Sequence, residues 1–402
     1  MTADTANERP QTPAQWAVRW HGLVLGGLLV FSVPVVHLGW HVVLSHDQPP
    51  IQTRSQLPAP VPTKENVLDG TWMTKEELHL REASPIVWWL RSNWNELRYH
   101  LGVPQSNQVH FGKDEWFFIA ASVHPDVAAF EAARPARRRF LGSVRDLVKR
   151  AGAELFMMVV PDKARVYPEL AFADGVMPAA KAPNYAAILA DLAAEGIPTV
   201  DLAAAMAAAR AADPKAELYF RRDTHWQPAG ALIGGQAAAA AIEQRFGALL
   251  SPRRPVELTG SMQVRLVGDL PANFGIGTIE LPDGRGSTRT VPMSLLSEHL
   301  AETREYYGVA IRDGERTLPM HGDDPAAEIL LIGTSFSKEN GAQALSLWLG
   351  RPVRTMIRLG AEGLLPLREA KQELEQGTRA KVVVWELVER GFFAEAWRDP
   401  KW

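Results

Sequence analysis

The segment from Arg222 to Pro228 (RDTHWQP) contains the residue types that proton transfer requires. Asp223 and His225 are two residues apart, so one short loop can place the carboxylate on one imidazole nitrogen. Such a carboxylate fixes the tautomer of the ring and stabilises the imidazolium, as general-base catalysis needs. The same pattern also fits a purely structural loop, with an Asx turn at Asp223 and a first-turn proline at Pro228.

A second candidate lies in the run from Ile329 to Ser337 (ILLIGTSFS), which is apolar and then ends in Gly-Thr-Ser. If the apolar part is a buried strand that precedes a helix, Ser335 stands where backbone N–H groups and the helix dipole favour an oxyanion. This position favours a nucleophile, although serine is also a frequent helix N-cap. The motif lacks the G-x-S-x-G pattern, which argues against an ordinary α/β-hydrolase.

Together, Ser335, His225 and Asp223 form a complete set for nucleophilic catalysis. The chain of 402 residues contains no cysteine, which excludes thiolate nucleophiles and cysteine-bound metal centres. It also lacks the phosphate-binding GxxxxGK[ST] and the zinc-binding HExxH motifs, so we expect neither a cofactor nor a metal. The 43 Lys+Arg against 46 Asp+Glu give a net charge of −3, which argues against nucleic-acid binding.

Alternating strand and helix patterns begin near residue 106 and predict an α/β domain with a mainly parallel sheet over 106–402. The carboxyl ends of such strands form the natural ligand crevice, where Ser335 would lie. Residues 249–328 are rich in glycine, proline and turn signals, and we expect an irregular, partly β insertion there. Expected strands are 115–121, 154–160, 198–202, 329–333 and 381–386; expected helices are 127–151, 184–195, 203–212, 229–246, 339–349 and 364–377.

The N-terminal part contains an apolar run at 22–45 without a single charged Asp, Glu, Lys or Arg. Its length, about 36 Å as a helix, exceeds the roughly 30 Å hydrocarbon core of a bilayer. A cleaved signal peptide is the alternative, but the run is too long for its apolar region and no A-x-A-like site follows. We therefore predict a transmembrane anchor.

Basic residues precede this run more closely than they follow it, which predicts a cytoplasmic tail at 1–21 and the remaining chain in the periplasm. Five prolines between positions 49 and 62 favour an extended tether over 46–70. The segment 71–105 contains four tryptophans and reads as an amphipathic helical segment.

Five motifs carry a family resemblance when they are taken in chain order: HFGKDEWFF at 110–118, VPDKARVYPE at 160–169, DTHW at 223–226, GTSFS at 333–337, and VWE at 384–386 with Glu389-Arg390. This combination resembles the alginate O-acetyltransferase family, specifically its SGNH-hydrolase-like AlgJ/AlgX type, over about residues 106–395. The resemblance implies a flavodoxin-like three-layer α/β/α domain. It also implies a circularly permuted motif order, because the serine block of ordinary SGNH hydrolases comes first.

The resemblance implies acetyl transfer onto hydroxyls of an exported polysaccharide, with Ser335 as nucleophile, His225 as base and then acid, and Asp223 as orienting carboxylate. It further implies a membrane-bound O-acyltransferase as the acetyl source and other exopolysaccharide biosynthesis and secretion proteins as partners. The expected location is the inner membrane, with a single span and a periplasmic catalytic domain. Alginate, cellulose or another β-linked glycan all remain open as the polymer.

Six further side chains are candidates for substrate contacts. The two aromatic rings could support a sugar face, the first two basic side chains could attract an anionic polymer, and the last two residues are candidates for the second oxyanion donor. Burial in the core, for the rings, and solvated loops, for the charges, are the alternatives. In that order they are Trp226, Tyr167, Lys163, Arg165, Asn340 and Arg358.

Two other functions compete with acetyl transfer. A polysaccharide acetyl esterase or deacetylase would use the same three residues in a wetter cleft. A non-catalytic adaptor would anchor a modification and secretion complex through the apolar run at 22–45 and the tryptophan-rich segment at 71–101. It would not require an intact Ser335, His225 and Asp223.

Overall fold

The computed structural model describes residues 61–102, 106–282, 288–292, 294–313, 316–319, 322, 324, 326–359 and 364–398. The chain divides into two compact units. A helical unit takes its described residues from 61–101 and 275–297, and an α/β unit takes them from 102–274 and 298–398. The predicted anchor at 22–45 and most of the predicted tether lie outside the described residues. Within the described residues, no helix has the length and apolar character needed to cross a bilayer.

The helical unit contains α3 (Lys64–Leu68), α4 (Thr71–Ala83) and α5 (Pro85–His100), together with the hairpin of β5 (Thr278–Pro282) and β6 (Thr288–Pro292). Two helices form within the predicted helical segment because Ser84 and Pro85 separate them. The Ser84 hydroxyl accepts a hydrogen bond from Val87 N, and Pro85 occupies the first turn, where its missing N–H costs nothing.

The α/β unit is built on a parallel sheet in the order β10-β9-β11-β3. Its strands are β3 (Glu154–Val160), β9 (Ile329–Gly333), β10 (Val353–Ile357) and β11 (Val382–Val388). The sequence predicted three of these strands, and β10 was missed because its polar residues at the sheet edge give no apolar run. The expected strand at 198–202 is reduced to a bridge between Thr199 and Met157.

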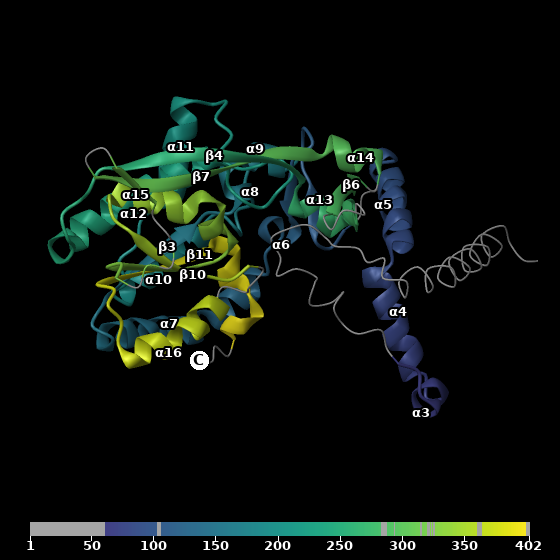
Figure 1. Cartoon of the computed structure of the whole chain (residues 1–402), viewed down its shortest axis with the longest axis horizontal. Coiled ribbons are helices and arrows are strands. Elements are labelled where there is room, and N and C mark those ends of the chain that lie inside the picture. The colour runs from purple at the N-terminus through teal and green to yellow at the C-terminus, as the bar shows by residue number, and fades with distance from the viewer. Residues whose placement is uncertain are drawn as a thin grey trace, which may run out of the picture. The chain divides into compact units, whose positions relative to one another are not determined.

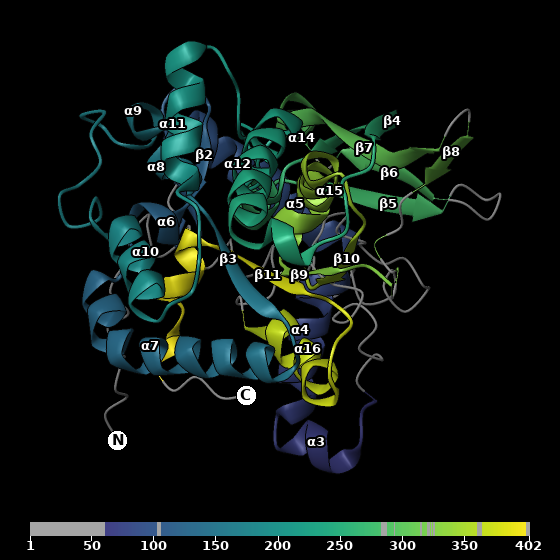
Figure 2. The ribbon, with the colours of Figure 1, turned by 90° about the vertical axis from the view of Figure 1, so that its left-hand side faces the viewer.

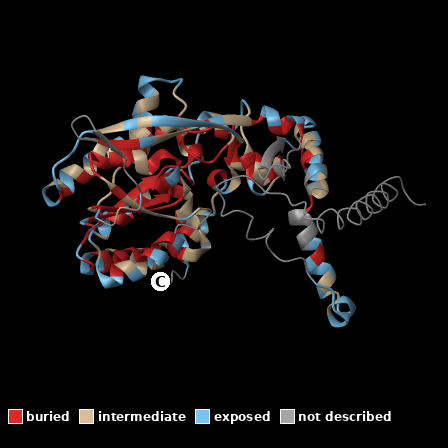
Figure 3. Cartoon of the chain, viewed as in Figure 1, coloured by how far each residue is buried: buried red, intermediate tan, exposed pale blue. Residues whose placement is uncertain are grey.

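Helices cover both faces of this sheet, which gives the three layers seen in Figures 1 and 2. Alternate residues of β3 point to opposite faces, and each set enters a separate apolar core. The buried residues lie mainly on the strands and on the helix faces that meet them (Figure 3). On one face lie α7 (Val127–Arg150), α10 (Asn184–Ala194) and α16 (Leu365–Gln376); on the other lie α11 (Leu202–Ala212), α12 (Pro228–Phe246) and α15 (Ala342–Leu349).

The insertion is more regular than the sequence predicted. Strand β4 (Val256–Val267) pairs antiparallel with β7 (Ala301–Asp313) along its whole length, and β8 (Arg316–Pro319) pairs with β7. The three-stranded sheet of β4, β7 and β8 lies above the parallel sheet in the view of Figure 1. The glycines that suggested irregular structure lie inside the strands: Gly260 is at the register shift between Thr259 and Ser261 of β4, and Gly308 of β7 pairs with Thr259.

Shorter elements complete the fold. The expected strand at 115–121 is a three-residue strand in a hairpin, β1 (Val109–Phe111) with β2 (Phe117–Ile119). Single-turn helices connect the larger elements. They are α6 (Ala120–Val123), α8 (Lys163–Val166), α9 (Pro168–Ala171), α13 (Asp269–Phe274), α14 (Leu295–His299) and the 3₁₀ turns Gly247–Leu249, Glu389–Phe393 and Glu395–Trp397.

Candidate active site

The histidine loop, residues 221–227, immediately precedes α12 and is held by backbone contacts on both sides. Phe220 N donates to His225 O at 3.1 Å, and Gln227 N donates to Leu218 O at 2.8 Å. Within the loop, His225 N donates to Asp223 Oδ1 at 2.9 Å, which is the local hydrogen bond expected of an Asx turn. The structural and catalytic interpretations of Asp223 are therefore compatible.

The serine turn, residues 334–341, follows β9 at the carboxyl edge of the parallel sheet. Glu386 on the neighbouring β11 accepts hydrogen bonds from Thr334 N at 2.7 Å and from Ser337 Oγ at 2.9 Å. Gly333 makes this close approach possible, because a Cβ there would lie 2.1 Å from Ser337 Oγ. The buried Glu386 carboxylate therefore fixes the position of the serine turn.

These two segments bring the three predicted catalytic residues together. His225 Nε2 lies 2.6 Å from Ser335 Oγ, and His225 Nδ1 lies 2.6 Å from Asp223 Oδ1. His225 and Asp223 are buried, whereas Ser335 is partly exposed. The result is a continuous hydrogen-bonded chain from hydroxyl to imidazole to carboxylate, the geometry of a Ser-His-Asp triad.

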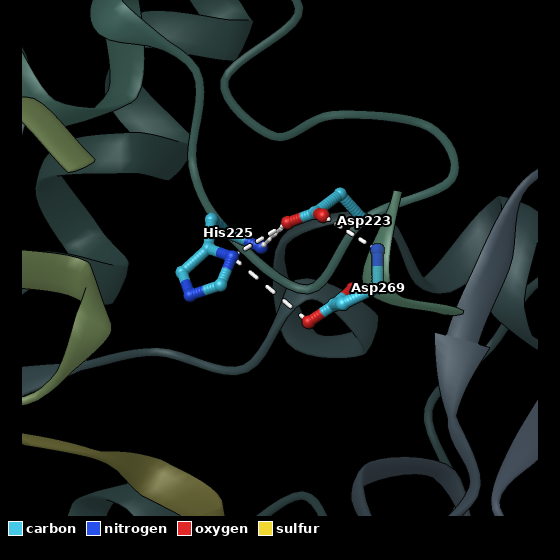
Figure 4. A group of neighbouring side chains, drawn as sticks. All are labelled: Asp223, His225 and Asp269. Atoms are coloured by element: carbon cyan, nitrogen blue, oxygen red, sulfur yellow. Dashed lines mark hydrogen bonds and ion pairs between the residues drawn. The ribbon is translucent and has the colours of Figure 1, made fainter. Parts of the chain in front are cut away.

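Two side chains of the insertion surround Asp223 and His225, and sequence analysis did not identify either of them. Asp269 N donates to Asp223 Oδ2 at 2.8 Å, and Asp269 Oδ2 lies 4.0 Å from His225 Nδ1 (Figure 4). Arg304 Nη2 also donates to Asp223 Oδ2. Asp269 and Arg304 lie 46 and 81 residues after Asp223, and no spacing rule links positions so far apart, so only the folded chain reveals them.

Electrostatics in this group favour a charged pair. Burial raises the pKa of Asp223, but the Arg304 guanidinium and His225 outweigh burial and hold this pKa well below its usual value. Burial lowers the pKa of His225, yet the Asp223 carboxylate and Asp269 raise it above the ordinary value. Burial and the adjacent Asp223 charge raise the pKa of Asp269 to about 6. Each shift follows from desolvation and neighbouring charges.

Ligand atoms of Asp223, His225 and Asp269 lie within 4.8 Å of one another, a grouping that resembles a metal site. However, the 2.6 Å separation of Nδ1 and Oδ1 is a hydrogen-bond distance, and Arg304 already supplies a cation to Asp223. We therefore interpret the group as a hydrogen-bonded charge network.

The aromatic and basic side chains proposed for substrate contacts have internal partners. Trp226 is 1% exposed, and its Nε1 donates to Glu339 O at 2.7 Å, so the ring supports the serine turn from inside. Tyr167 is also buried and donates to Ala216 O. These positions differ from the expectation of exposed sugar platforms, because both rings fill the core beneath the site.

Lys163 is buried, and its Nζ donates to the carbonyl oxygens of Phe117, Arg221 and Asp223, which ties α8 to the histidine loop. Burial lowers the pKa of Lys163 to about 7. Its position differs from the expected surface attraction for a polymer. Arg165 likewise forms an ion pair with the buried Glu389, at 2.5 Å.

The two candidates for a second oxyanion donor are also engaged elsewhere. Asn340 Nδ2 donates to Glu305 O at 2.7 Å, and Asn340 Oδ1 accepts from Tyr307 N at 3.0 Å, so its amide binds the edge of β7. Arg358 forms an ion pair with Glu369 at 2.5 Å and is largely exposed. Within the described residues, these contacts do not link either side chain to the hydroxyl of Ser335.

Comparison with known proteins places this site in a family. The family model described as "SGNH hydrolase-like domain, acetyltransferase AlgX" matches residues 109–389, which is more than two thirds of the chain. The chain belongs to this AlgX acetyltransferase family. The match confirms the resemblance that the five motifs carried, and it places the triad, the serine turn and the insertion inside the family domain.

Named relatives agree with the family assignment. The chain is 28% identical over 348 residues to a probable alginate O-acetylase AlgJ of Pseudomonas syringae pv. tomato, covering 84% of this chain and 83% of that protein. It is 29% identical over 332 residues to the AlgJ of Pseudomonas fluorescens, covering 81% and 78%. The solved O-acetyltransferase domain of Pseudomonas putida AlgJ is similar with a TM-score of 0.55 and 26% identity, covering 71% of this chain and 93% of that domain.

Proposed function

We propose that this protein is a membrane-anchored periplasmic O-acetyltransferase that moves acetyl groups, through an acetyl-serine intermediate, onto hydroxyls of an exported polysaccharide. The observation that carries this proposal is the unbroken chain Ser335 Oγ, His225 and Asp223, with both links at 2.6 Å. Family membership supports acetyl as the transferred group.

In the first half-reaction, Ser335 Oγ attacks the carbonyl carbon of a donor acetyl ester while His225 Nε2 accepts the hydroxyl proton. The negative charge that develops on the carbonyl oxygen faces the backbone N–H of Ser335. Collapse of the tetrahedral intermediate breaks the donor C–O bond, and His225 returns its proton to the leaving oxygen. The enzyme then carries acetyl on Ser335.

In the second half-reaction, a polysaccharide hydroxyl attacks the acetyl-serine while His225 Nε2 accepts its proton. Collapse releases Ser335 Oγ, which recovers the proton from His225. Asp223 keeps Nδ1 protonated throughout and stabilises the imidazolium at both steps. Water in place of the sugar hydroxyl would give hydrolysis, so transfer requires a site that excludes water when the acceptor binds.

Three further parts of the proposal come from the sequence and the relatives. The apolar run at 22–45 supports an inner-membrane anchor with the α/β unit in the periplasm. The names of the AlgJ relatives support a place in polysaccharide modification, with an alginate-like polymer as the first acceptor to test. A membrane-bound O-acyltransferase is the proposed acetyl source.

A direct test incubates the detergent-purified full chain with an activated acetyl ester, with and without alginate or cellulose oligosaccharides. Mass spectrometry should find acetylated oligosaccharide, and acetylated Ser335 in the absence of an acceptor. Free acetate without sugar acetylation, even with acceptor present, would indicate an esterase. No reaction by the wild type, and none by Ser335→Ala, would indicate an adaptor.

A further inference from the structure

Strand β7 of the insertion contacts both segments that carry the catalytic residues. We propose that Arg304 on β7 is a positioning residue for the proposed acetyl transfer, holding Asp223 in line with His225 while the next residues of β7 hold the serine turn. This inference rests on the proposed function. Strand β7 lies outside all five sequence motifs.

The first step concerns the two oxygens of Asp223. Oδ1 faces His225, whereas Oδ2 receives hydrogen bonds from Asp269 N and from Arg304 Nη2. Both partners of Oδ2 belong to the insertion. Rotation of the carboxylate would break both of these bonds, so the insertion fixes the plane in which Asp223 meets the imidazole.

The second step concerns the charge of Arg304. Its side chain is 2% exposed and lies between Asp223 and Glu339, whose Oε1 is 3.4 Å from Arg304 Nη1. Burial lowers the pKa of Arg304, but these two carboxylates raise it above the ordinary value, so the guanidinium stays charged. A buried cation that links two acidic residues from different segments couples their positions.

The third step concerns the residues that follow Arg304 along the strand. The backbone of Glu305 and Tyr307 binds both ends of the Asn340 amide, and the Tyr306 hydroxyl lies 3.3 Å from Glu339 Oε1. Asn340 has a φ of 62°, a left-handed conformation that asparagine tolerates and that these two bonds hold. Within four residues, therefore, β7 holds both the orienting carboxylate and the nucleophile-bearing turn.

The test is a double-mutant cycle in the full chain, with Arg304→Met and Asp223→Asn measured singly and together. Arg304→Met should lower kcat about 10²-fold with KM changed less than about threefold, because it displaces the carboxylate without removing substrate contacts. If Arg304 acts through Asp223, the double variant should be no slower than Asp223→Asn alone. Multiplicative losses, or a fully active Arg304→Met, would overturn the proposal.

The matched control is Arg265→Met on the adjacent strand β4. Arg265 is exposed and donates to Glu298 O, so this change should leave kcat unaltered. Arg304→Lys covers the case in which Arg304→Met fails to fold. A lysine keeps the charge but cannot bridge two carboxylates with a planar fork, so about a tenfold loss of kcat is expected, and wild-type kcat in a folded Arg304→Lys would contradict the proposal.

An NMR titration of His225 gives a readout that does not depend on activity. Asp223, Asp269 and Glu339 act on His225 directly, whereas Arg304 and Lys163 contact Asp223. These five charged groups come from the histidine loop, α13, the serine turn, β7 and α8. If Arg304 holds Asp223 in line with His225, its removal lets the carboxylate turn away from Nδ1, so the pKa of His225 should fall in Arg304→Met, whereas loss of the Arg304 charge alone would raise it. An unshifted or raised titration would count against Arg304 even if the wild type shows no acetyl transfer, whereas absent transfer with a lowered pKa would count only against the proposed function.

Discussion

At the scale of single residues, two carboxylates with different tasks lie near the same nitrogen of His225, Nδ1. Asp223 forms the hydrogen bond to Nδ1, whereas Asp269 lies 4.0 Å from the same nitrogen and binds Thr224 N instead. Both negative charges favour the imidazolium and raise the pKa of His225 above its ordinary value. As the pH decreases, the neutral imidazole that would act as general base is therefore protonated at a higher pH than in an ordinary histidine. Asp223 and Asp269 therefore act together on the pKa of His225.

This pair predicts the pH dependence of the proposed reaction. The neutral imidazole is the base, so kcat/KM should fall as the pH decreases through the raised pKa of His225. Asp269→Asn removes a carboxyl group whose pKa is about 6 and whose negative charge raises the pKa of His225. The acidic limb of the profile should therefore move to lower pH by about half a unit or more. A pH profile of kcat/KM measures this shift; an unchanged or upward-shifted limb would contradict the assigned role of Asp269.

A second prediction at this scale concerns the nucleophile and its base. Ser335→Ala and His225→Ala should each lower kcat at least about 10³-fold, and the double variant should be no worse than either, because the two residues act as one unit. Initial rates of acetyl transfer measure the loss, and circular dichroism shows whether the fold is intact. Substantial activity in a folded Ser335→Ala would exclude the acetyl-serine route.

At the scale of elements, Glu386 is the link between the parallel sheet and the serine turn. Its side chain is fully buried at the end of β11 and accepts from Thr334 N, Thr334 Oγ1 and Ser337 Oγ. Glu386→Ala would leave these donors buried without a partner, which should lower the free energy of unfolding by about 2–4 kcal/mol. Urea denaturation measures the change, with the exposed Glu375→Ala as control; equal stabilities of the two variants would contradict this role.

A glycine joins the histidine loop to the insertion in a similar way. A Cβ at Gly268 would lie 2.1 Å from Arg222 O, next to the backbone that carries Asp223 and Asp269. Gly268→Ala should therefore shift both carboxylates and lower kcat about tenfold or more. Gly277→Ala is the matched control, because a Cβ at Gly277 meets nothing within 4 Å. Equal kcat values for the two variants would show that the close approach at Gly268 does not matter.

At the scale of the whole molecule, the proposal places the α/β unit beside the membrane through the run at 22–45. The full chain should remain in the membrane fraction after alkaline carbonate extraction, and its N-terminal sequence should still include residues before position 22. Replacing four apolar residues of the run with arginine should release the protein into the soluble fraction. A mature protein that begins after Ser45 would show cleavage and contradict the anchor.

The sequence by itself determined the layered α/β fold and pointed to the triad residues. Strands β3, β9 and β11 are short apolar runs, and the spacing of Asp223 and His225 is a local property that one loop can satisfy. The order of the five motifs also indicated the family, and the match to the family model confirmed that indication.

Only the tertiary structure decided what surrounds these residues. Trp226, Tyr167 and Lys163 have residue types that suit a substrate surface, yet each is buried, because burial depends on which elements pack above a residue and not on its neighbours in sequence. Arg304 and Asp269 reach Asp223 from an insertion whose pairing of β4 with β7 joins distant segments. Contacts of this kind follow from long-range packing, which local patterns do not encode.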